Sequence, residues 1–349
     1  LAKGENRIGF IFNIVIRCRS REFVWSSDIS KLYNQLRMHV SAYPYSLFLY
    51  DESLDASVDP TVWVMVRAWY GIYSTGGQAG HAIEKLTEMF KNEYPEAEKP
   101  LKDNRYVDDL LSGTDTIEQR EKEIEAVQKV LSKGGFNLKF VVRSGDRPSE
   151  KASSDGESMK LLGYRWDTEK DTLSPGVGEL NMNKKKRGEK KANEFPVVSQ
   201  EDADLMLKEV VLTRRMILAK ISELFDPCGF WEPIKVQMKL ELRKIQGLGW
   251  DDAIPKENQM RWKVILRDYV YLHEICIPRF CIPSVEVSKS KIRLVCLSDA
   301  AELCGGAAIY AGRRFDDGSW SCSLLAAKSK MLHATIPRNE LSAILLCTE

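Results

Sequence analysis

The sequence predicts an α+β protein in which antiparallel strands and packed helices occupy successive regions of the chain. A short apolar run ends in an acid at residues 23–28, and two adjacent acids lie beside apolar residues at 105–111, which is typical of strands joined by tight turns. Residues 116–133 place Ile124, Val127 and Leu131 on one face, as amphipathic helices do. A linker-like stretch rich in Lys, Gly and Pro, residues 171–200, precedes a region with helical patterns at 201–247.

The other elements follow in chain order. Residues 62–66 are an apolar run that predicts a buried strand, and residues 78–94 have helical spacing. The run 213–225 predicts a helix that stops at Asp226-Pro227, and residues 258–275 predict another. Residues 292–300, 305–310 and 320–325 predict three strands, after which Pro337 opens a last helix.

Composition limits the class of protein. The 349 residues suit two or three domains, and 44% hydrophobic with 29% charged residues suit a soluble globular chain. The net charge is +1, so a nucleic-acid surface would have to be a local patch. The basic run 184–191 is the candidate patch and is equally typical of a solvated loop.

The eight cysteines form no C-x-x-C pair, which argues against zinc and against a secreted disulfide scaffold. No long uncharged apolar run is present, so no membrane span or membrane partner is expected. We therefore expect an intracellular, reduced protein that is not secreted. The first residue is Leu1, with no start methionine or signal peptide, which favours a piece of a longer polyprotein.

Two adjacent acids, Asp108 and Asp109, follow Tyr106-Val107 and precede an apolar pair. Neighbouring carboxylates beside apolar residues are costly unless a positive charge lies on them, and a divalent metal ion is the obvious candidate. A tight turn between two short strands can expose both carboxylates at its tip. A solvated turn is the alternative, since Asp is common in turns.

A third acid, Asp28, ends the apolar run 23–28, and Tyr33 follows it by five positions at the start of a predicted helix. Asp28 and Asp108 each end or turn a predicted strand, so both are candidate direct metal ligands. Lys139 lies in a later predicted strand, where an exposed strand lysine is the alternative to a functional one.

These motifs together resemble those of a reverse transcriptase. Asp28 with Tyr33 resembles the first palm motif of that family, residues 67–79 the second, and Tyr106–Asp109 the third. Residues 134–139 look like the fourth motif and residues 161–166 like the fifth, the primer-grip hairpin. Residues 28–31, 134–138 and above all 224–229, followed by Pro233, narrow the resemblance to the polymerase region of Bel/Pao long-terminal-repeat retrotransposons.

The resemblance implies a right-hand polymerase palm that adds dNTPs to a primer 3′-hydroxyl by two-metal nucleotidyl transfer, with Mg²⁺ or alternatively Mn²⁺. Asp28, Asp108 and Asp109 would be catalytic metal ligands, the last with a weaker or indirect role.

Tyr33 would exclude a ribose 2′-hydroxyl, with an ordinary core aromatic as the alternative. Gln78 and Lys139 would contact the dNTP, and the primer grip would include Leu162, Gly163 and Tyr164. The second motif departs from the retroviral form, with Gly76-Gly77 before Gln78.

The last part of the chain resembles the start of an RNase H domain. Asp299 ends a predicted strand and matches the first strand acid of that family, and Glu340 matches its first helix acid. A solvated acid at a strand end is the alternative for Asp299. The acids that the family carries on later elements are absent from these 349 residues, so we expect this part to be incomplete and inactive in RNA cleavage.

The resemblance implies three regions: partial fingers and palm at 1–175, a helical thumb or connection at 176–285, and the amino-terminal part of an RNase H-like domain at 286–349. Expected partners are an RNA or DNA template with its primer and the other polyprotein parts, namely protease, integrase and the remaining RNase H, in a cytoplasmic particle or the nucleus. One alternative is a degenerate element-derived protein that binds nucleic acid without catalysis. Another is a cyclase-like enzyme on the same palm topology.

Overall fold

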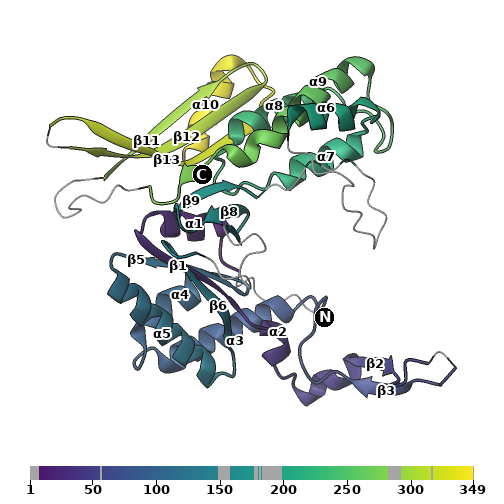
Figure 1. The fold of residues 1–349 in the computed structure, drawn as a ribbon, viewed down its shortest axis with the longest axis vertical. Helices are drawn as coiled ribbons and strands as arrows, with labels where there is room; N and C mark the ends of the chain where they lie inside the picture. Colours follow the sequence, from purple (N-terminus) through teal and green to yellow (C-terminus); the bar gives the residue numbers. More distant parts are fainter. Residues whose placement is uncertain are drawn as a thin grey trace. The chain divides into compact units, whose positions relative to one another are not determined.

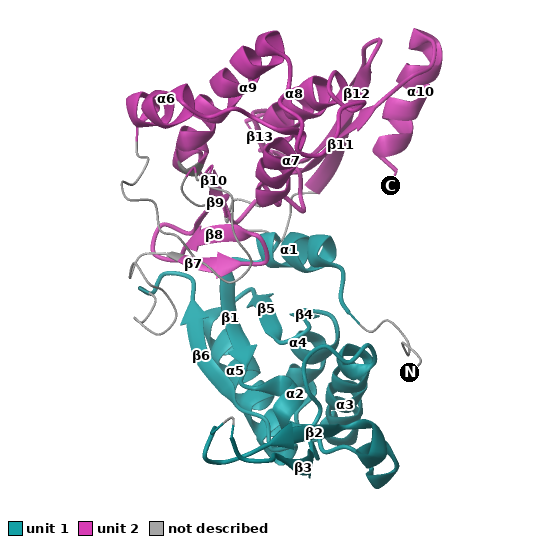
Figure 2. Cartoon of the chain, turned by 90° about the vertical axis from the view of Figure 1, so that its right-hand side faces the viewer, with its two compact units in different colours: residues 1–154 teal, residues 155–349 magenta. Residues whose placement is uncertain are grey.

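The computed structural model describes residues 8–55, 57–147, 158–176, 180, 182, 199–281, 292–315 and 317–348. The chain divides into two compact units, residues 1–154 and 155–349 (Figure 2). The helices and antiparallel sheets confirm the predicted α+β class. The functional boundaries expected near residues 175 and 285 stay predictions, and the basic run 184–191 lies outside the described residues.

The first unit has a four-stranded antiparallel sheet of order β4-β5-β1-β6, of which Figure 1 labels β5, β1 and β6 and Figure 2 labels all four strands. Its strands are β1 (Phe23–Ile29), β4 (Arg105–Tyr106), β5 (Asp109–Thr114) and β6 (Leu138–Arg143), with a separate hairpin of β2 (Leu47–Tyr50) and β3 (Thr61–Val64). Its helices are α1 (Ile11–Arg19), α2 (Leu32–Gln35), α3 (Thr75–Phe90), α4 (Glu98–Lys102) and α5 (Ile117–Lys133), with 3-10 turns η1 (Val40–Tyr45) and η2 (Pro95–Ala97).

The core of this unit lies between one face of the sheet and helices α3, α4 and α5. Trp25 and Ile29 of β1 are fully buried there against Ile83 of α3, Leu101 of α4 and Val127 of α5. The helix predicted at 116–133 is confirmed as α5. The side chain of Thr116 caps its amino-terminal end by accepting a hydrogen bond from the Gln119 amide. Odd-numbered residues of β1 fill this core, so its even-numbered residues face the other side.

The β2–β3 hairpin corrects one prediction. The strand at Thr61–Val64 forms where an apolar run was noted, but all four of its residues are exposed. β3 pairs only with β2 in the described part of the chain, and a two-stranded hairpin offers no layer that could bury it. The aromatic rings of Tyr50 and Trp63 pack edge to face across the hairpin, 5.8 Å apart, and thereby cover part of each other.

The second unit has two further antiparallel sheets, of order β10-β9-β8-β7 and β11-β12-β13. The strands are β7 (Ser158–Leu161), β8 (Tyr164–Asp167), β9 (Thr172–Pro175), β10 (Ile277–Pro278), β11 (Ile292–Ala300), β12 (Cys304–Arg314) and β13 (Trp320–Met331). The helices are α6 (Gln200–Lys208), α7 (Arg214–Glu223), α8 (Glu232–Arg243), α9 (Lys256–Asp268) and α10 (Ile336–Leu346), with η3 (Tyr269–Glu274) after α9.

Most elements predicted for the second unit are confirmed, with two corrections. Residues 172–175, expected to be linker, form β9, because the buried ion pair of Arg279 with Asp171 (2.6 Å) holds the chain beside β10. The helix expected over 258–275 is α9 followed by the tighter turn η3. Helix α10 packs on β11 and β12, and α8 packs on β13.

We predict that Leu131→Ala destabilises the protein by about 2–5 kcal/mol, because it leaves a cavity in the core under α5. Leu131 is fully buried, whereas Ile117 at the start of the same helix is 49% exposed. Ile117→Ala is the matched control and should change the free energy of unfolding by less than about 0.5 kcal/mol. Urea unfolding followed by circular dichroism measures both, and equal losses would contradict this account of the core.

Candidate active site

Asp28 and Asp109 lie directly opposite each other on neighbouring antiparallel strands, β1 and β5. Opposite residues of such a pair place their side chains on the same face, with Cα atoms roughly 4.5–5.5 Å apart. Asp28 is an even-numbered residue of β1, so both carboxylates lie on the face turned away from α5. The sheet therefore brings together two acids that are 81 positions apart in the sequence.

The third acid, Asp108, lies in the two-residue turn that joins β4 to β5, where Tyr106 pairs with Asp109. The first turn residue, Val107, has a φ of 57°, a conformation that β-branched residues rarely adopt. Two hydrogen bonds hold this turn. The buried Arg105 guanidinium donates to the Val107 carbonyl (2.7 Å), and the Ile29 amide donates to the Asp108 carbonyl (2.8 Å).

Two of the three carboxylates, those of Asp108 and Asp109, have a raised affinity for protons. Partial burial, with the negative charges of Asp108 and Asp28, raises the pKa of Asp109 to about 6. Burial also raises the pKa of Asp108, and the Asp28 charge adds to the shift. Asp109 is nonetheless an exposed residue, so water reaches this acid and screens part of the repulsion.

Lys139 of β6 supplies the positive charge of the cluster. Its Nζ lies 2.8 Å from Asp28 Oδ1, and this contact raises the pKa of the lysine. Asp28 Oδ1 is buried and meets no well-aligned hydrogen bond within the described residues, so its compensation rests on the contact with Lys139. The structure therefore places Lys139 beside an acid, where the sequence left it either as a dNTP contact or as an exposed strand lysine.

The three carboxylates are suited to supply part of the ligand set of a bound cation. Carboxylate oxygens are the ligands that Mg²⁺ prefers, and an incompletely compensated buried oxygen beside two acids of raised pKa favours an added positive charge. Among the described residues, however, no three His, Cys, Asp or Glu side chains form a ready-made metal cage. Substrate phosphates and water would have to complete the shell, as they do for Mg²⁺ in phosphoryl-transfer sites.

Tyr33 lies next to the acids. Burial raises the pKa of its hydroxyl, and the charge of Asp108 adds to the effect. Its ring packs edge to face on Tyr70 with centroids 5.4 Å apart, and it borders the core of the unit. Gln78 is exposed in the first turn of α3, where its amide contacts Ser74 Oγ (3.3 Å). The roles of these two residues at a dNTP stay predictions.

The residues expected in the primer grip form the β7–β8 hairpin of the second unit. Leu162 and Gly163 make its turn, with φ values of 46° and 105°. Tyr164 is fully buried, whereas Leu162 and Gly163 of the turn are partly exposed. If this hairpin contacts a primer, Leu162 and Gly163 are the contacting residues and Tyr164 supports them from below.

The two predicted RNase H acids lie on different sides of the β11–β13 sheet. A Cβ at Gly305 would lie 3.2 Å from Ala343 of α10, so Gly305 faces that helix. The next residue, Gly306, is the partner of Asp299, and both therefore face away from α10, which carries Glu340. No hydrogen bond or ion pair joins the two acids in the described part of the chain, and their shared role stays a prediction.

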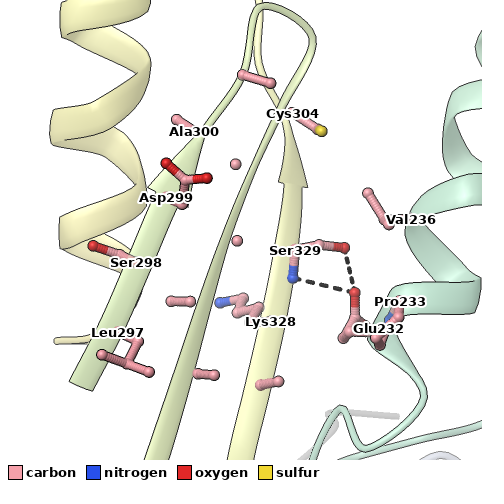
Figure 3. Close-up of a pocket in the computed structure, with 16 residues that line it drawn as sticks. Glu232, Pro233, Val236, Leu297, Ser298, Asp299, Ala300, Cys304, Lys328 and Ser329 are labelled. Atoms are coloured by element: carbon pink, nitrogen blue, oxygen red, sulfur yellow. Dashed lines mark hydrogen bonds between the residues drawn. The ribbon is translucent and has the colours of Figure 1, made fainter. Parts of the chain in front are cut away.

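Asp299 lines a groove of about 450 Å³ between this sheet and the start of α8. Figure 3 shows Asp299 on β11, with Ser329 and Glu232 on the other side of the groove. Glu232 accepts hydrogen bonds from the Ser329 amide (3.1 Å) and from Lys239 Nζ (3.0 Å). Two acids therefore line the groove. Asp299 is exposed, whereas the negative charge of Glu232 is compensated by Lys239 and by a hydrogen bond from the Ser329 amide.

Comparison with known proteins identifies the carboxy-terminal region. Residues 213–349 match the family described as the Pao retrotransposon-like RNaseH-like domain. This region is therefore similar to that family. The resemblance to Bel/Pao elements is thereby confirmed for this region, and the matched region begins upstream of residue 286, within the region expected to be thumb or connection. No curated protein matches the chain.

Two solved structures share the fold of the chain. One is a foamy viral protease–reverse transcriptase in complex with an RNA/DNA hybrid, with a TM-score of 0.52 and 12% identity. The other is a foamy viral protease–reverse transcriptase dRH in complex with double-stranded DNA, with a TM-score of 0.56 and 12% identity. The alignments cover 96% and 100% of this chain but only 37% and 50% of the viral ones. The predicted polymerase-like fold is confirmed.

Two structural features of the site were missed in the sequence. The role of Arg105 in holding the strained turn was not predicted, although a basic residue directly before Tyr106 was a visible signal. The Asp28–Lys139 ion pair was also missed, because it depends on the pairing of β1 with β6 and not on any local pattern. The described residues contain no helix of the length and apolar character needed to cross a membrane.

We predict that Asp109→Asn stabilises the protein above pH 6 when no divalent cation is added. A raised pKa means that the folded state binds the proton more tightly, so ionisation of Asp109 costs stability as pH rises from about 4 to about 6. The amide removes that cost, and the gain should be at most about 1 kcal/mol because water screens the exposed acid. Urea unfolding of both proteins from pH 4 to pH 8 measures it. A difference that stays constant over this range would contradict the prediction.

Proposed function

We propose that the chain is the reverse transcriptase region of a Bel/Pao-type retrotransposon polyprotein, which adds dNTPs to a primer 3′-hydroxyl on an RNA or DNA template. One observation carries the proposal. The register of β1 and β5 places Asp28 opposite Asp109, with Asp108 in the adjoining strained turn. The family of the carboxy-terminal region and the reverse-transcriptase fold of the chain support the same conclusion.

In this proposal Asp28 and Asp108 would hold Mg²⁺, and Asp109 would support them as the adjacent acid. Bound there, the ions would stabilise the attacking and leaving oxygens during in-line displacement at phosphorus. The rigid sheet would keep the carboxylates in place, since the turn is tied on both sides by Arg105 and Ile29. Lys139 would exchange its contact with Asp28 for a contact with a substrate phosphate, because a lysine ammonium binds phosphate as a point charge.

A nucleic-acid-binding protein without catalysis is the rival function. Binding requires phosphate contacts but gives no reason to gather three mutually repelling acids. The strain at Val107 and the raised pKa of Asp109 are both costs of keeping these acids together. Their persistence therefore favours a function in which the acids act on substrate.

We predict that Asp108→Asn lowers primer extension by the parent polymerase at least about a hundredfold, because a lost metal ligand removes several kcal/mol of transition-state stabilisation. Template–primer affinity should stay within about twofold of wild type, since it comes mostly from phosphate contacts. Asp103→Asn, which changes an exposed acid of the same unit, is the matched control and should extend normally.

Two measurements separate the possible causes of this result. Single-turnover extension on a labelled primer gives the rate, and filter binding gives the affinity. Mg²⁺ should also raise the Tm of wild type and of Asp103→Asn more than that of Asp108→Asn. Extension at a near wild-type rate by Asp108→Asn would exclude this turn as the metal site. Tight binding without extension by wild type would favour the non-catalytic rival.

We predict that Tyr33→Val raises the use of ribonucleotides relative to deoxynucleotides by about tenfold or more. If the ring lies beside the sugar of the incoming nucleotide, a 2′-hydroxyl would meet a packed wall, and such overpacking typically costs about 1–3 kcal/mol. The measured quantity is the ratio of kcat/KM for rNTP and dNTP, because the overall rate also falls when the sugar loses its support. Tyr70→Val, which removes the exposed partner ring, is the control. An unchanged ratio in an active Tyr33→Val enzyme would leave Tyr33 as a core aromatic.

A further inference from the structure

The segment Leu224–Trp231, here called the junction segment, links three parts of the second unit. Asp226 lies at its centre and is nearly buried. Its carboxylate accepts hydrogen bonds from the amides of Gly229 (2.9 Å), Phe230 (3.1 Å) and Trp231 (2.9 Å). These bonds fold the chain into a tight loop immediately before α8, so Asp226 sets the direction in which that helix begins.

The first link runs from Asp226 to the β7–β8 hairpin. The hydroxyl of Tyr164 donates to Asp226 Oδ1 (2.8 Å) and accepts from the Cys228 amide (2.8 Å). Burial strongly raises the pKa of Tyr164, so the hydroxyl remains a donor. Its ring also packs on Phe230 and Trp231, with centroids 5.4 and 5.6 Å away. The strand that follows the hairpin turn is thus fastened to the junction segment by two hydrogen bonds and two ring contacts.

The second link is made at the hairpin turn itself. A Cβ at Gly163 would lie 2.4 Å from Cδ1 of Phe225, so the ring of Phe225 lies directly against the turn. Gly163 has a φ of 105°, which few other residues adopt. The absence of a side chain at Gly163 therefore serves both the turn and the close approach of the ring.

The third link joins the junction segment to the β11–β13 sheet. The Ala327 amide of β13 donates to the Cys228 carbonyl (2.8 Å). Gly229 approaches the same strand so closely that a Cβ there would lie 1.7 Å from the Ala327 carbonyl oxygen. The contacts of Glu232 and Lys239 with Ser329 extend this attachment along α8. The junction segment is therefore fixed to the edge strand of the sheet as firmly as to the hairpin.

We propose that Tyr164 and Asp226 are positioning residues that make the Leu162–Gly163 turn and the β11–β13 sheet move as one body. The relevance to a primer rests on the proposed function, in which this turn would hold the primer end. A primer held by the turn would then keep a fixed placement relative to the RNase H-like sheet. Loosening the junction segment would release the turn and the sheet together, although their own sequences are unchanged.

Hydrogen exchange of the full chain tests the mechanical part without any enzymatic activity. Tyr164→Phe removes the hydroxyl that connects Asp226 with Cys228 and should speed amide exchange about tenfold in both Tyr164–Asp167 and the part of β13 around Ala327. Tyr269→Phe is the matched control, because Tyr269 is a buried tyrosine whose hydroxyl has no hydrogen-bond partner among the described residues. It should leave both regions unchanged.

Asp226→Asn is the second variant, in case Tyr164→Phe fails to fold, because the amide keeps the size of the side chain and one acceptor oxygen. It should speed exchange in the same two regions. Faster exchange confined to one region, or unchanged exchange in both, would overturn the proposal.

Primer extension tests the functional part separately. In single-turnover assays Tyr164→Phe should lower the rate of dNTP addition about tenfold, since small misplacements of reacting groups are costly, while template–primer affinity stays within about twofold of wild type. Tyr269→Phe should extend at the wild-type rate. A wild-type rate in Tyr164→Phe would overturn the positioning role. A wild-type chain that extends no primer would contradict the proposed function, while the exchange experiment would still decide whether the turn and the sheet are coupled.

Discussion

Three carboxylates that repel one another share one edge of the β4-β5-β1-β6 sheet, and the rest of the first unit must hold them there. The register of β1 and β5 sets Asp28 opposite Asp109, and the raised pKa of Asp109 is the electrostatic consequence. Like charges directly opposite each other destabilise a sheet. The large core beneath α5 provides the stability that lets the sheet tolerate this arrangement.

The same constraint explains the backbone of the turn. Val107 adopts a φ of 57°, although a glycine or asparagine would do so at lower cost. The turn persists because Arg105 and Ile29 bond its two carbonyl groups from opposite sides. A strained turn that is tied in this way resists relaxation, and carboxylates on it keep a fixed geometry for a substrate.

Local patterns predicted the local elements and the identity of the acids, whereas features set by distant contacts were not predicted. The helix α5 followed from its apolar face, and the acids were found by their places beside apolar residues. The exposure of β3 was not predicted, because an apolar run does not show whether another layer covers it. The face on which Asp299 lies depends on the short connection between β11 and β12, which sets the pairing with Gly306.

Residues 224–229 show most clearly which features of the structure a sequence pattern does not predict. They contributed to the Bel/Pao resemblance. Their pattern also predicted the end of a helix, and α7 does end just before Asp226, at Glu223. The pattern did not show that Asp226 bonds Tyr164, 62 positions earlier, or that Cys228 bonds Ala327, 99 positions later. A buried carboxylate that accepts four hydrogen bonds is costly to remove, because its donors would be left unsatisfied. Such a network is rigid, so the hairpin and the sheet that it joins move as a single body and not independently of each other.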